Sequence, residues 1–193
     1  MINIEELSHL IETRRAYFHK MYTDQSIDPA SIDLILENAN WAPTHKRTEP
    51  WRFKIFHSLD SRKRFVEFIA KDYTENTPAE SFSEIKRNEN SEKPLIAACT
   101  IAICMQRDPA QSVPEWEEIA SVACAVQNMW LSCTALGLGC YWATPGFISR
   151  ISTFLELEEG GKCLGLFYMG HLKPGVVVPA SRKPISSKIR WMN

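Results

Sequence analysis

The hydrophobic and polar positions of the chain follow two periods, which predicts helices and strands in alternation. Apolar residues at helical spacing mark five segments, and Asp28-Pro29 before the second one is a typical helix start. We therefore expect helices over residues 4–15, 29–41, 61–72, 116–136 and 145–157. Alternating or continuous apolar runs predict strands over residues 51–57, 95–105, 139–143 and 162–170. This order favours a sheet covered by helices, of class α/β or α+β.

Two segments depart from this pattern. Residues 74–94 are rich in Glu, Ser, Asn and Lys, which predicts a solvated, mobile insertion that would serve as a lid. Residues 174–193 begin with a proline-rich stretch, so we expect an extended C-terminal arm of the kind that wraps a partner. The whole length of 193 residues, 45% of them hydrophobic, suits one domain over residues 1–193.

The predicted helix after residue 116 is apolar on nearly all sides. Between residues 117 and 138 it carries almost no charge beyond Glu118. A helix of this composition is buried all round, either as a central core helix or at an interface between subunits. The sequence favours neither alternative over the other.

Charge and composition exclude several classes of partner. The net charge is -1 and no basic patch stands out, so we expect no binding to nucleic acid or to an anionic membrane surface. The acidic N-terminus lacks the features of a signal peptide, and the apolar run over residues 95–105 is too short to cross a bilayer. We therefore expect a cytoplasmic protein without a membrane span.

Cysteine and histidine give no support for a metal site. The six cysteines include no Cys-x-x-Cys pair, and the five histidines form no His-x-x-x-His pair. We interpret the cysteines as buried structural thiols rather than as disulfides or metal ligands. The chain also lacks a Gly-x-Gly-x-x-Gly motif after a strand, so a nicotinamide cofactor would have no dedicated Rossmann site.

The segment between the second predicted helix and the first predicted strand is the most informative part of the chain. Residues 39–51 combine Trp41, His45 and Trp51 with two prolines in an otherwise polar stretch. Such a composition is typical of a segment that holds a ligand. From the residues alone, the better interpretation of His45 is a loop histidine that is satisfied by backbone hydrogen bonds.

A cationic cluster follows the first predicted helix. Arg14, Arg15 and Lys20 would clamp a phosphate through charge-assisted hydrogen bonds, and the pair Arg182-Lys183 offers a second cluster near the C-terminus. On their own, paired arginines at a helix end more often complement the helix dipole and face water. The spacing does not decide whether the two clusters grip one anion or form two unrelated patches.

Several short motifs occur in one order and spacing. They are Arg14-Arg15-Ala16, Trp41-Ala42-Pro43-Thr44-His45, Glu49-Pro50-Trp51-Arg52-Phe53, Val113-Pro114-Glu115-Trp116, Gly139-Cys140-Tyr141-Trp142-Ala143-Thr144-Pro145 and Gly165-Leu166-Phe167-Tyr168-Met169-Gly170. Together they resemble the nitroreductase family, and more narrowly its small, minimal branch of FMN-dependent oxidoreductases. The resemblance covers most of the chain.

This resemblance implies a nitroreductase-like α+β fold with a central mixed sheet flanked by helices. It also implies an intertwined homodimer with one FMN in each of two clefts at the subunit interface, so that residues of both subunits would touch each flavin. No side chain is expected to be catalytic, because hydride transfer belongs to the flavin and the protein supplies orientation and electrostatics.

The resemblance further assigns residues to the cofactor. The expected FMN-binding set is Arg14, Arg15, Ala16, Lys20, Trp41, His45, Trp142, Ala143, Thr144 and Arg182. Arg14, Arg15 and Ala16 match the positions that bind the phosphate and the ribityl chain, and Ala16 stands where the family commonly has serine. Without the resemblance, Trp142 would be interpreted as a core aromatic and Thr144 as a helix cap.

The activity that the resemblance implies is ping-pong oxidoreduction. NADH or NADPH would reduce the flavin and leave, and a small-molecule acceptor such as a nitroaromatic or a quinone would then take the electrons. The competing interpretation is a flavin-binding carrier or sensor that is not a reductase. A further alternative is the same fold used for another flavin reaction, such as dehalogenation.

Overall fold

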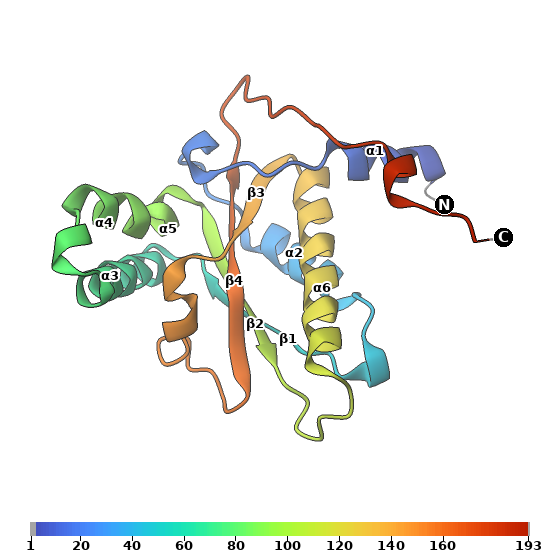
Figure 1. The fold of residues 1–193 in the computed structure, drawn as a ribbon. Coiled ribbons are helices and arrows are strands. Elements are labelled where there is room, and N and C mark those ends of the chain that lie inside the picture. The colour runs from blue at the N-terminus through green and yellow to red at the C-terminus, as the bar shows by residue number, and fades with distance from the viewer. Residues whose placement is uncertain (1–2, 193) are drawn as a thin grey trace.

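Four strands form the centre of the structure, a computed structural model that describes residues 3–192. They are β1 (Trp51–Phe56), β2 (Cys99–Gln106), β3 (Leu138–Ala143) and β4 (Gly161–His171), in the spatial order β1-β2-β4-β3 (Figure 1). The expected mixed sheet is wrong for this part of the chain. The pairs β1-β2, β2-β4 and β4-β3 are all antiparallel.

Helices cover both faces of the sheet (Figure 1). The long helix α6 (Glu115–Ala135) and α2 (Pro29–Asn40) lie on one face, and α3 (Leu59–Asn76) lies on the other with α4 (Glu84–Ser91) and α5 (Lys93–Ile96). Helix α1 (Ile4–Thr13) packs against α6. None of the helices between residues 3 and 192 has the length and apolarity needed to span a membrane.

Five short 3-10 helices complete the structure between residues 3 and 192. They are η1 (His19–Met21), η2 (His45–Arg47), η3 (Ala79–Ser81), η4 (Gly146–Arg150) and η5 (Ile185–Lys188). All of them lie in connecting segments or in the arm, and Phe147 of η4 also belongs to the core on the α3 side.

The alternation of strand residues divides the core into two halves. On β2, Ile101 and Ile103 pack with Met129 on the side of α2 and α6, whereas Ala102 and Cys104 pack on the side of α3. Both halves are buried, so β2 has an almost continuous apolar sequence without strand-like alternation. This explains why the run over residues 95–105 identified a buried strand.

The helix boundaries follow capping residues in the sequence. Asp28 accepts a hydrogen bond from the backbone amide of Ser31 at 2.9 Å, and Pro29 occupies the first helical position of α2. Asn3 and Glu6 form a reciprocal capping box at the start of α1. The predicted starts of these two helices are therefore confirmed.

Two expectations about the connecting segments need correction. Residues 145–157 form η4 and then turns, not a helix, because Ile148 and Ile151 are β-branched and Glu156 adopts a left-handed φ of 52°. Residues 74–94 contain the end of α3 together with α4, and Pro94 is buried. The mobility of this segment and its role as a lid stay predictions.

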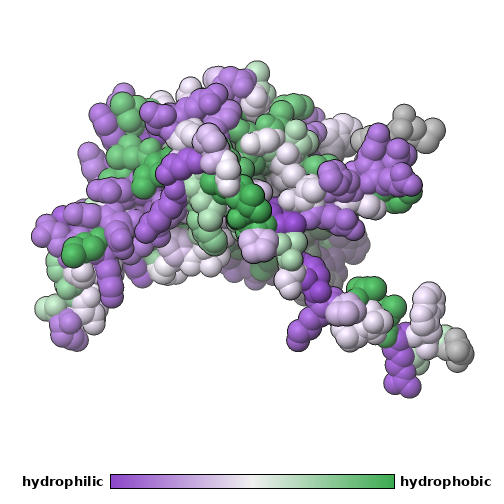
Figure 2. All heavy atoms as spheres, turned by 90° about the horizontal axis from the view of Figure 1, so that it is seen from above, coloured by the Kyte–Doolittle hydropathy of each residue, from purple (hydrophilic) through white to green (hydrophobic). Residues whose placement is uncertain are grey.

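The C-terminal arm extends away from the body of the molecule. Figure 2 shows it projecting from the main surface, and Val177, Trp191 and Met192 are all exposed. Residue 193, the last of the predicted arm, lies outside the described residues. The expectation that the arm wraps a partner stays a prediction.

Candidate functional site

Three of the predicted phosphate-binding residues share one cavity. Arg14, Arg15 and Arg182 line a hollow of about 830 Å³ between the end of α1, the last turns of α6 and the arm. We call it the arginine cavity; its full lining is Ile11, Glu12, Arg14, Arg15, Gln127, Trp130, Ala180, Ser181 and Arg182. The two cationic clusters near opposite ends of the chain thus face the same space.

The arginine cavity is held together by Trp130 and Arg15. The guanidinium of Arg14 lies over the Trp130 ring at 4.8 Å, and Nε1 of Trp130 donates to the carbonyl of Arg15 at 2.8 Å. Arg15 in turn donates from Nε to the carbonyl of Val178 at 3.1 Å and from Nη1 to that of Glu12 at 2.5 Å. Arg15 therefore ties the arm to α1 and brings Arg182 over the cavity.

The charges in this cavity are not neutralised by ion pairs. Within residues 3–192, the side chains of Arg14, Arg15 and Arg182 form no salt bridge with a carboxylate. Glu12 is the one acidic residue in the lining, and its carbonyl, not its carboxylate, accepts from Arg15. The net positive potential suits an anionic group such as a phosphate.

A second cavity of about 420 Å³ lies between α3, η4 and the ends of β3 and β4. We call it the lysine cavity; its lining is Ile69, Asp72, Tyr73, Asn76, Thr77, Asn90, Lys93, Ala143, Pro145, Gly146, Phe147, Arg150 and Tyr168. Ala143, a member of the predicted site, lies here. Aromatic rings and a few polar groups line the cavity, which is typical of a site for a flat organic ligand.

The lysine cavity has a cationic side. Burial lowers the pKa of the Lys93 ammonium, with Lys20 lowering it further and Glu89 opposing them. Burial also lowers the pKa of His19, together with the nearby charges of Lys93 and Lys20. Lys20 thus acts on Lys93 and His19, and it does not line the arginine cavity as the predicted cluster implied.

An ion pair fixes the wall of the lysine cavity. Nε and Nη2 of Arg150 each donate to one carboxylate oxygen of Asp72 at 2.7 Å, and Asp72 is only 8% exposed. The carboxylate of Asp72 raises the pKa of Arg150. The pair fastens η4 to α3, and this holds the backbone of residues 145–147 at the cavity wall.

An extended segment joins the two cavities. After Arg14 and Arg15, the chain runs beside the edge strand β3, where the amide of Tyr17 donates to the carbonyl of Cys140 at 3.0 Å. Ala16 and Tyr17 pack against the core on the α3 side. The segment ends at His19, whose Nδ1 lies 2.9 Å from the hydroxyl of Tyr141. A long ligand with one anionic end would lie along this segment.

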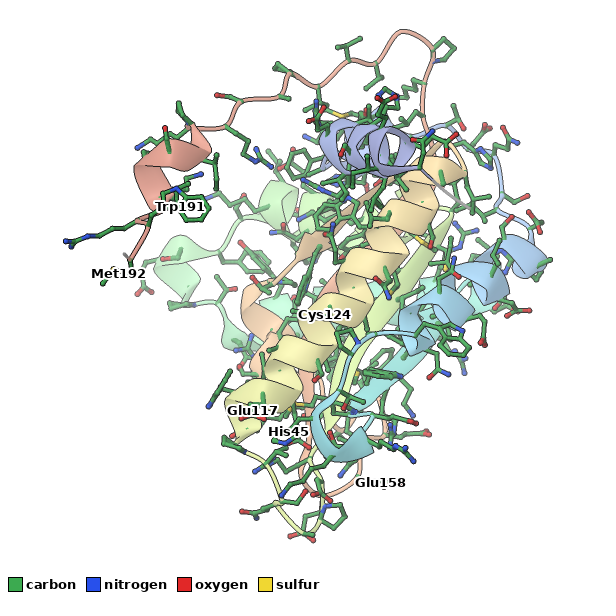
Figure 3. All side chains as sticks on the ribbon, turned by 90° about the vertical axis from the view of Figure 1, so that its right-hand side faces the viewer. His45, Glu117, Cys124, Glu158, Trp191 and Met192 are labelled. Carbon is green, nitrogen blue, oxygen red and sulfur yellow. The ribbon has the colours of Figure 1, made fainter. Side chains whose placement is uncertain are left out.

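Trp41 and His45 line neither cavity within one chain. Trp41 is 78% exposed, and His45 Nδ1 lies 2.5 Å from a carboxylate oxygen of Glu117 near the start of α6 (Figure 3). The arginine cavity contacts Trp130, thirteen residues further along the same helix, which corresponds to about 20 Å of helix axis. A single chain does not bring these predicted site residues together.

Trp142 and Thr144 contribute less than expected to either cavity. Trp142 packs on the α2 and α6 side of the sheet, opposite to Ala143, and donates to the carbonyl of Leu164 at 3.2 Å. Its indole covers Gly165 so closely that any side chain at that position would clash with Nε1 of Trp142. Thr144 is exposed and lines neither cavity. The packing of the Trp142 side chain agrees with its alternative interpretation as a core aromatic.

The comparison with known proteins decides the family. The family model described as Nitroreductase family matches residues 11–171, which is most of the chain. The chain belongs to the nitroreductase family. The predicted resemblance is thereby confirmed, and the antiparallel sheet with helices on both faces is its nitroreductase-like α+β fold.

Individual nitroreductases are similar over most of their length. YdjA of Escherichia coli (strain K12), named "Putative NAD(P)H nitroreductase", is 27% identical over 72% of this chain and 74% of its own. A nitroreductase-like family protein from Bacillus cereus has a TM-score of 0.80 with 24% identity, covering 100% of this chain and 98% of that one. The FMN-dependent nitroreductase NfnB from Mycobacterium smegmatis, solved in complex with NADPH, has a TM-score of 0.74 with 16% identity, covering 97% and 98%.

Sequence reasoning missed several residues that line the cavities of this member of the nitroreductase family. Lys93, Asp72 and Arg150 come from α5, α3 and η4, which are far apart in the sequence and meet only in the fold. The polar composition of residues 74–94 predicted a mobile insertion, so Lys93 gave no signal of a role in a cavity. Trp130 on α6 gave one usable signal, because the indole N–H of a large buried aromatic needs a hydrogen-bond acceptor.

Proposed function

We propose that this protein is an FMN-dependent NAD(P)H oxidoreductase that reduces nitroaromatic, quinone or similar electron-poor acceptors by ping-pong hydride transfer. The observation that carries the proposal is the arginine cavity, in which Arg14, Arg15 and Arg182 converge from opposite ends of the chain. Membership of the nitroreductase family and the FMN dependence of the similar NfnB support the flavin assignment, and the NADPH of the NfnB complex supports the donor assignment.

The residues of this chain fit the two ends of FMN. Arg14 and Arg182 would bind the phosphate in the arginine cavity. Arg15 would also donate to the phosphate, through the N–H groups of its guanidinium that do not already bond to the carbonyls of Val178 and Glu12. The backbone beside Ala16 would follow the ribityl chain, with the amide retained although the hydroxyl of a serine is absent. The extended segment from Arg14 to His19 supplies the path between the two cavities.

The lysine cavity would take the edge of the isoalloxazine ring. Ala143 and the backbone of Gly146 would lie against the ring, while the half-buried Lys93 would place positive charge near it. When bound, the flavin supplies the hydride chemistry. Lys93, with Lys20 behind it, would stabilise the negative charge of a reduced ring, since a fixed charge in a partly dry site acts strongly.

The proposal includes a homodimer that completes the site. The face of α6 that points away from the sheet carries Trp116, Ile119, Ala123 and Cys124, and Trp116 is 67% exposed. Figure 3 shows this face with Cys124 in view, and no other described element covers it. Two copies packed with antiparallel α6 helices would bury the apolar face and carry His45 of one copy toward the arginine cavity of the other.

A visible spectrum recorded without oxygen tests the proposed activity. Purified protein should show oxidised-flavin bands that bleach when NADPH or NADH is added and return when a nitroaromatic or quinone is added. Bands that persist with both donors would contradict the reductase assignment and favour a flavin carrier or sensor. A colourless protein that FMN does not reconstitute would contradict the cofactor assignment itself.

A further inference from the structure

Two cysteines face one another across the two central strands. Cys104 on β2 and Cys163 on β4 are directly opposite partners in the antiparallel ladder, beside a register shift between Ile103 and Cys104. Both side chains lie on the α3 side of the sheet, one in the core and the other packed against it. Opposite residues of an antiparallel pair have Cα atoms about 4.5–5.5 Å apart, within the range of about 4.4–6.8 Å that a disulfide spans.

The two thiols already interact. Each thiol donates to a carbonyl of its own strand, Cys104 to Ala102 at 3.7 Å and Cys163 to Gly165 at 3.5 Å. The neighbouring Cys163 and burial raise the pKa of Cys104, whereas the neighbouring Cys104 lowers the pKa of Cys163. The two residues are paired in the ladder, and both side chains lie on the same side of the sheet. Closing the bond between them therefore needs rotation of two side chains rather than movement of the strands.

The two cysteines differ in their access to solvent. Cys104 is 0% exposed, whereas Cys163 is partly exposed. A partly exposed thiol with a lowered pKa is the more reactive nucleophile, and a buried thiol beside it is suited to react second. The pair thus has the asymmetry of a peroxide-reactive cysteine and a resolving cysteine.

We propose that Cys104 and Cys163 form a reversible intramolecular disulfide when the protein meets a hydroperoxide, with Cys163 as the residue attacked first. This modification site is separate from the proposed flavin reaction and does not depend on it. The link would join the two central strands at the register shift and fix the sheet there.

The chemistry balances with hydrogen peroxide as the oxidant. The Cys163 thiolate attacks one peroxide oxygen, the O–O bond breaks, and the hydroxide that leaves takes a proton to become water. Sγ of Cys104, after losing its proton, then attacks Sγ of the sulfenic acid; the S–S bond forms and the S–O bond breaks. The second hydroxide takes the Cys104 proton. The two thiols lose two electrons in total, and the peroxide is reduced to two waters.

The other cysteines serve as internal controls. Cys124 is exposed on α6, which corrects the expectation that all six cysteines are buried, and it can link only to another molecule. Cys133 and Cys140 also lie close enough for Cys133 to raise the pKa of Cys140 further, after burial, but both are fully buried. Peroxide should reach Cys124 as a lone thiol and should leave the Cys133 and Cys140 pair reduced.

Peptide mapping after peroxide treatment tests the proposal. The purified protein, with its flavin and without any nicotinamide donor, would be treated with hydrogen peroxide, quenched in acid, alkylated and digested. A Cys124→Ser background removes links between molecules. We expect an intact mass lower by two hydrogens, a peptide that joins Cys104 to Cys163, and restoration of both thiols by dithiothreitol.

Two variants identify the order of attack. Cys163→Ala should abolish the link, and Cys104→Ala should leave a sulfenic acid at Cys163 that dimedone traps. The mapping of the unsubstituted pair does not depend on the folding of either variant. Absence of the link at peroxide concentrations that oxidise Cys124 in the wild type would overturn the proposal, as would conversion of Cys163 to sulfinic acid without a link to Cys104.

Discussion

The arginine cavity and the lysine cavity lie at the two ends of one extended segment, yet they are built in different ways. The arginine cavity is wide and carries three guanidinium groups whose charges no carboxylate neutralises within residues 3–192. The lysine cavity has about half the volume, and its guanidinium group, Arg150, is already paired with Asp72. Its remaining cation, Lys93, is half-buried and donates from Nζ to the side chain of Asn90 on α4 at 2.9 Å.

This difference indicates two kinds of recognition. An open cluster of cations attracts an anion through Coulomb interactions that salt screens, with a Debye length of about 8 Å at physiological ionic strength. A narrower cavity with a desolvated lysine selects a ligand by its shape and by a few directed hydrogen bonds. FMN, with a phosphate at one end and a flat ring at the other, matches both, and separate changes in the two cavities should have distinct effects.

The largest effect should come from removing both arginines of the arginine cavity. Arg14→Ala with Arg15→Ala should weaken FMN binding by about 100-fold or more, since each charge-assisted hydrogen bond contributes about 1.5–3 kcal/mol and 1.4 kcal/mol is a factor of ten. Titration of FMN fluorescence measures the loss, and raising the salt concentration should weaken the wild type toward the variant. The exposed Arg190→Ala on the arm is the matched control; FMN affinity unchanged in the double variant would refute the phosphate role.

A charge on the outer face of α6 should have the next largest effect. Ala123→Asp leaves a single chain intact, because the side chain is exposed, but a paired α6 would bury the carboxylate at a cost of several kcal/mol. We expect the dimer to dissociate in analytical ultracentrifugation and FMN affinity to fall by at least about tenfold, since 1.4 kcal/mol already gives that factor. Ala30→Asp on the exposed side of α2 is the control. A variant that sediments as the wild type does would contradict the proposed packing.

The sequence predicted the arginine cavity better than the lysine cavity for a physical reason. Arg14 and Arg15 are neighbours in the chain at a helix end, so their common location needs no tertiary information. Lys93, Asp72 and Arg150 converge only after α3, α5 and η4 have packed on the sheet. The hydrophobic pattern predicted the four strands, because burial imposes the pattern locally, but it does not determine which loops meet above them.

The strand period contained one more usable signal. Trp142 and Ala143 are consecutive on β3, so their side chains must point to opposite faces of the sheet. The structure places Ala143 at the lysine cavity and Trp142 on the other side of the sheet, and a flavin contact of both side chains stays a prediction. The separation of His45 from Arg14 is different in kind, since the pattern of one chain does not determine which residues of a second copy would complete the proposed site.

A smaller effect should follow from neutralising the lysine cavity. Lys93→Met keeps the length and apolar stem of the side chain but removes its charge, so FMN affinity should fall by about tenfold, as expected for one charge-assisted hydrogen bond. The reduction potential of the bound flavin should also fall, because the reduced anion loses its stabilising charge. Lys86→Met on exposed α4 is the control. In contrast to the Arg14 and Arg15 double variant, the loss of FMN affinity in Lys93→Met should depend little on salt concentration. A strongly salt-dependent loss would show that Lys93 acts on the ligand as the open cations of the arginine cavity do.

The smallest effect should be the pH dependence of stability through His19. Its folded-state pKa is lowered from about 6.5 by burial and by Lys93 and Lys20, so below pH 6.5 the unfolded chain binds more protons than the folded one. The free energy of unfolding should therefore fall as the pH drops below 6.5, and urea unfolding at a series of pH values measures this. His19→Asn should flatten the profile, whereas His9→Asn on exposed α1 should leave it unchanged. A profile that keeps its slope in the His19 variant would assign the pH dependence to groups outside the segment that joins the two cavities.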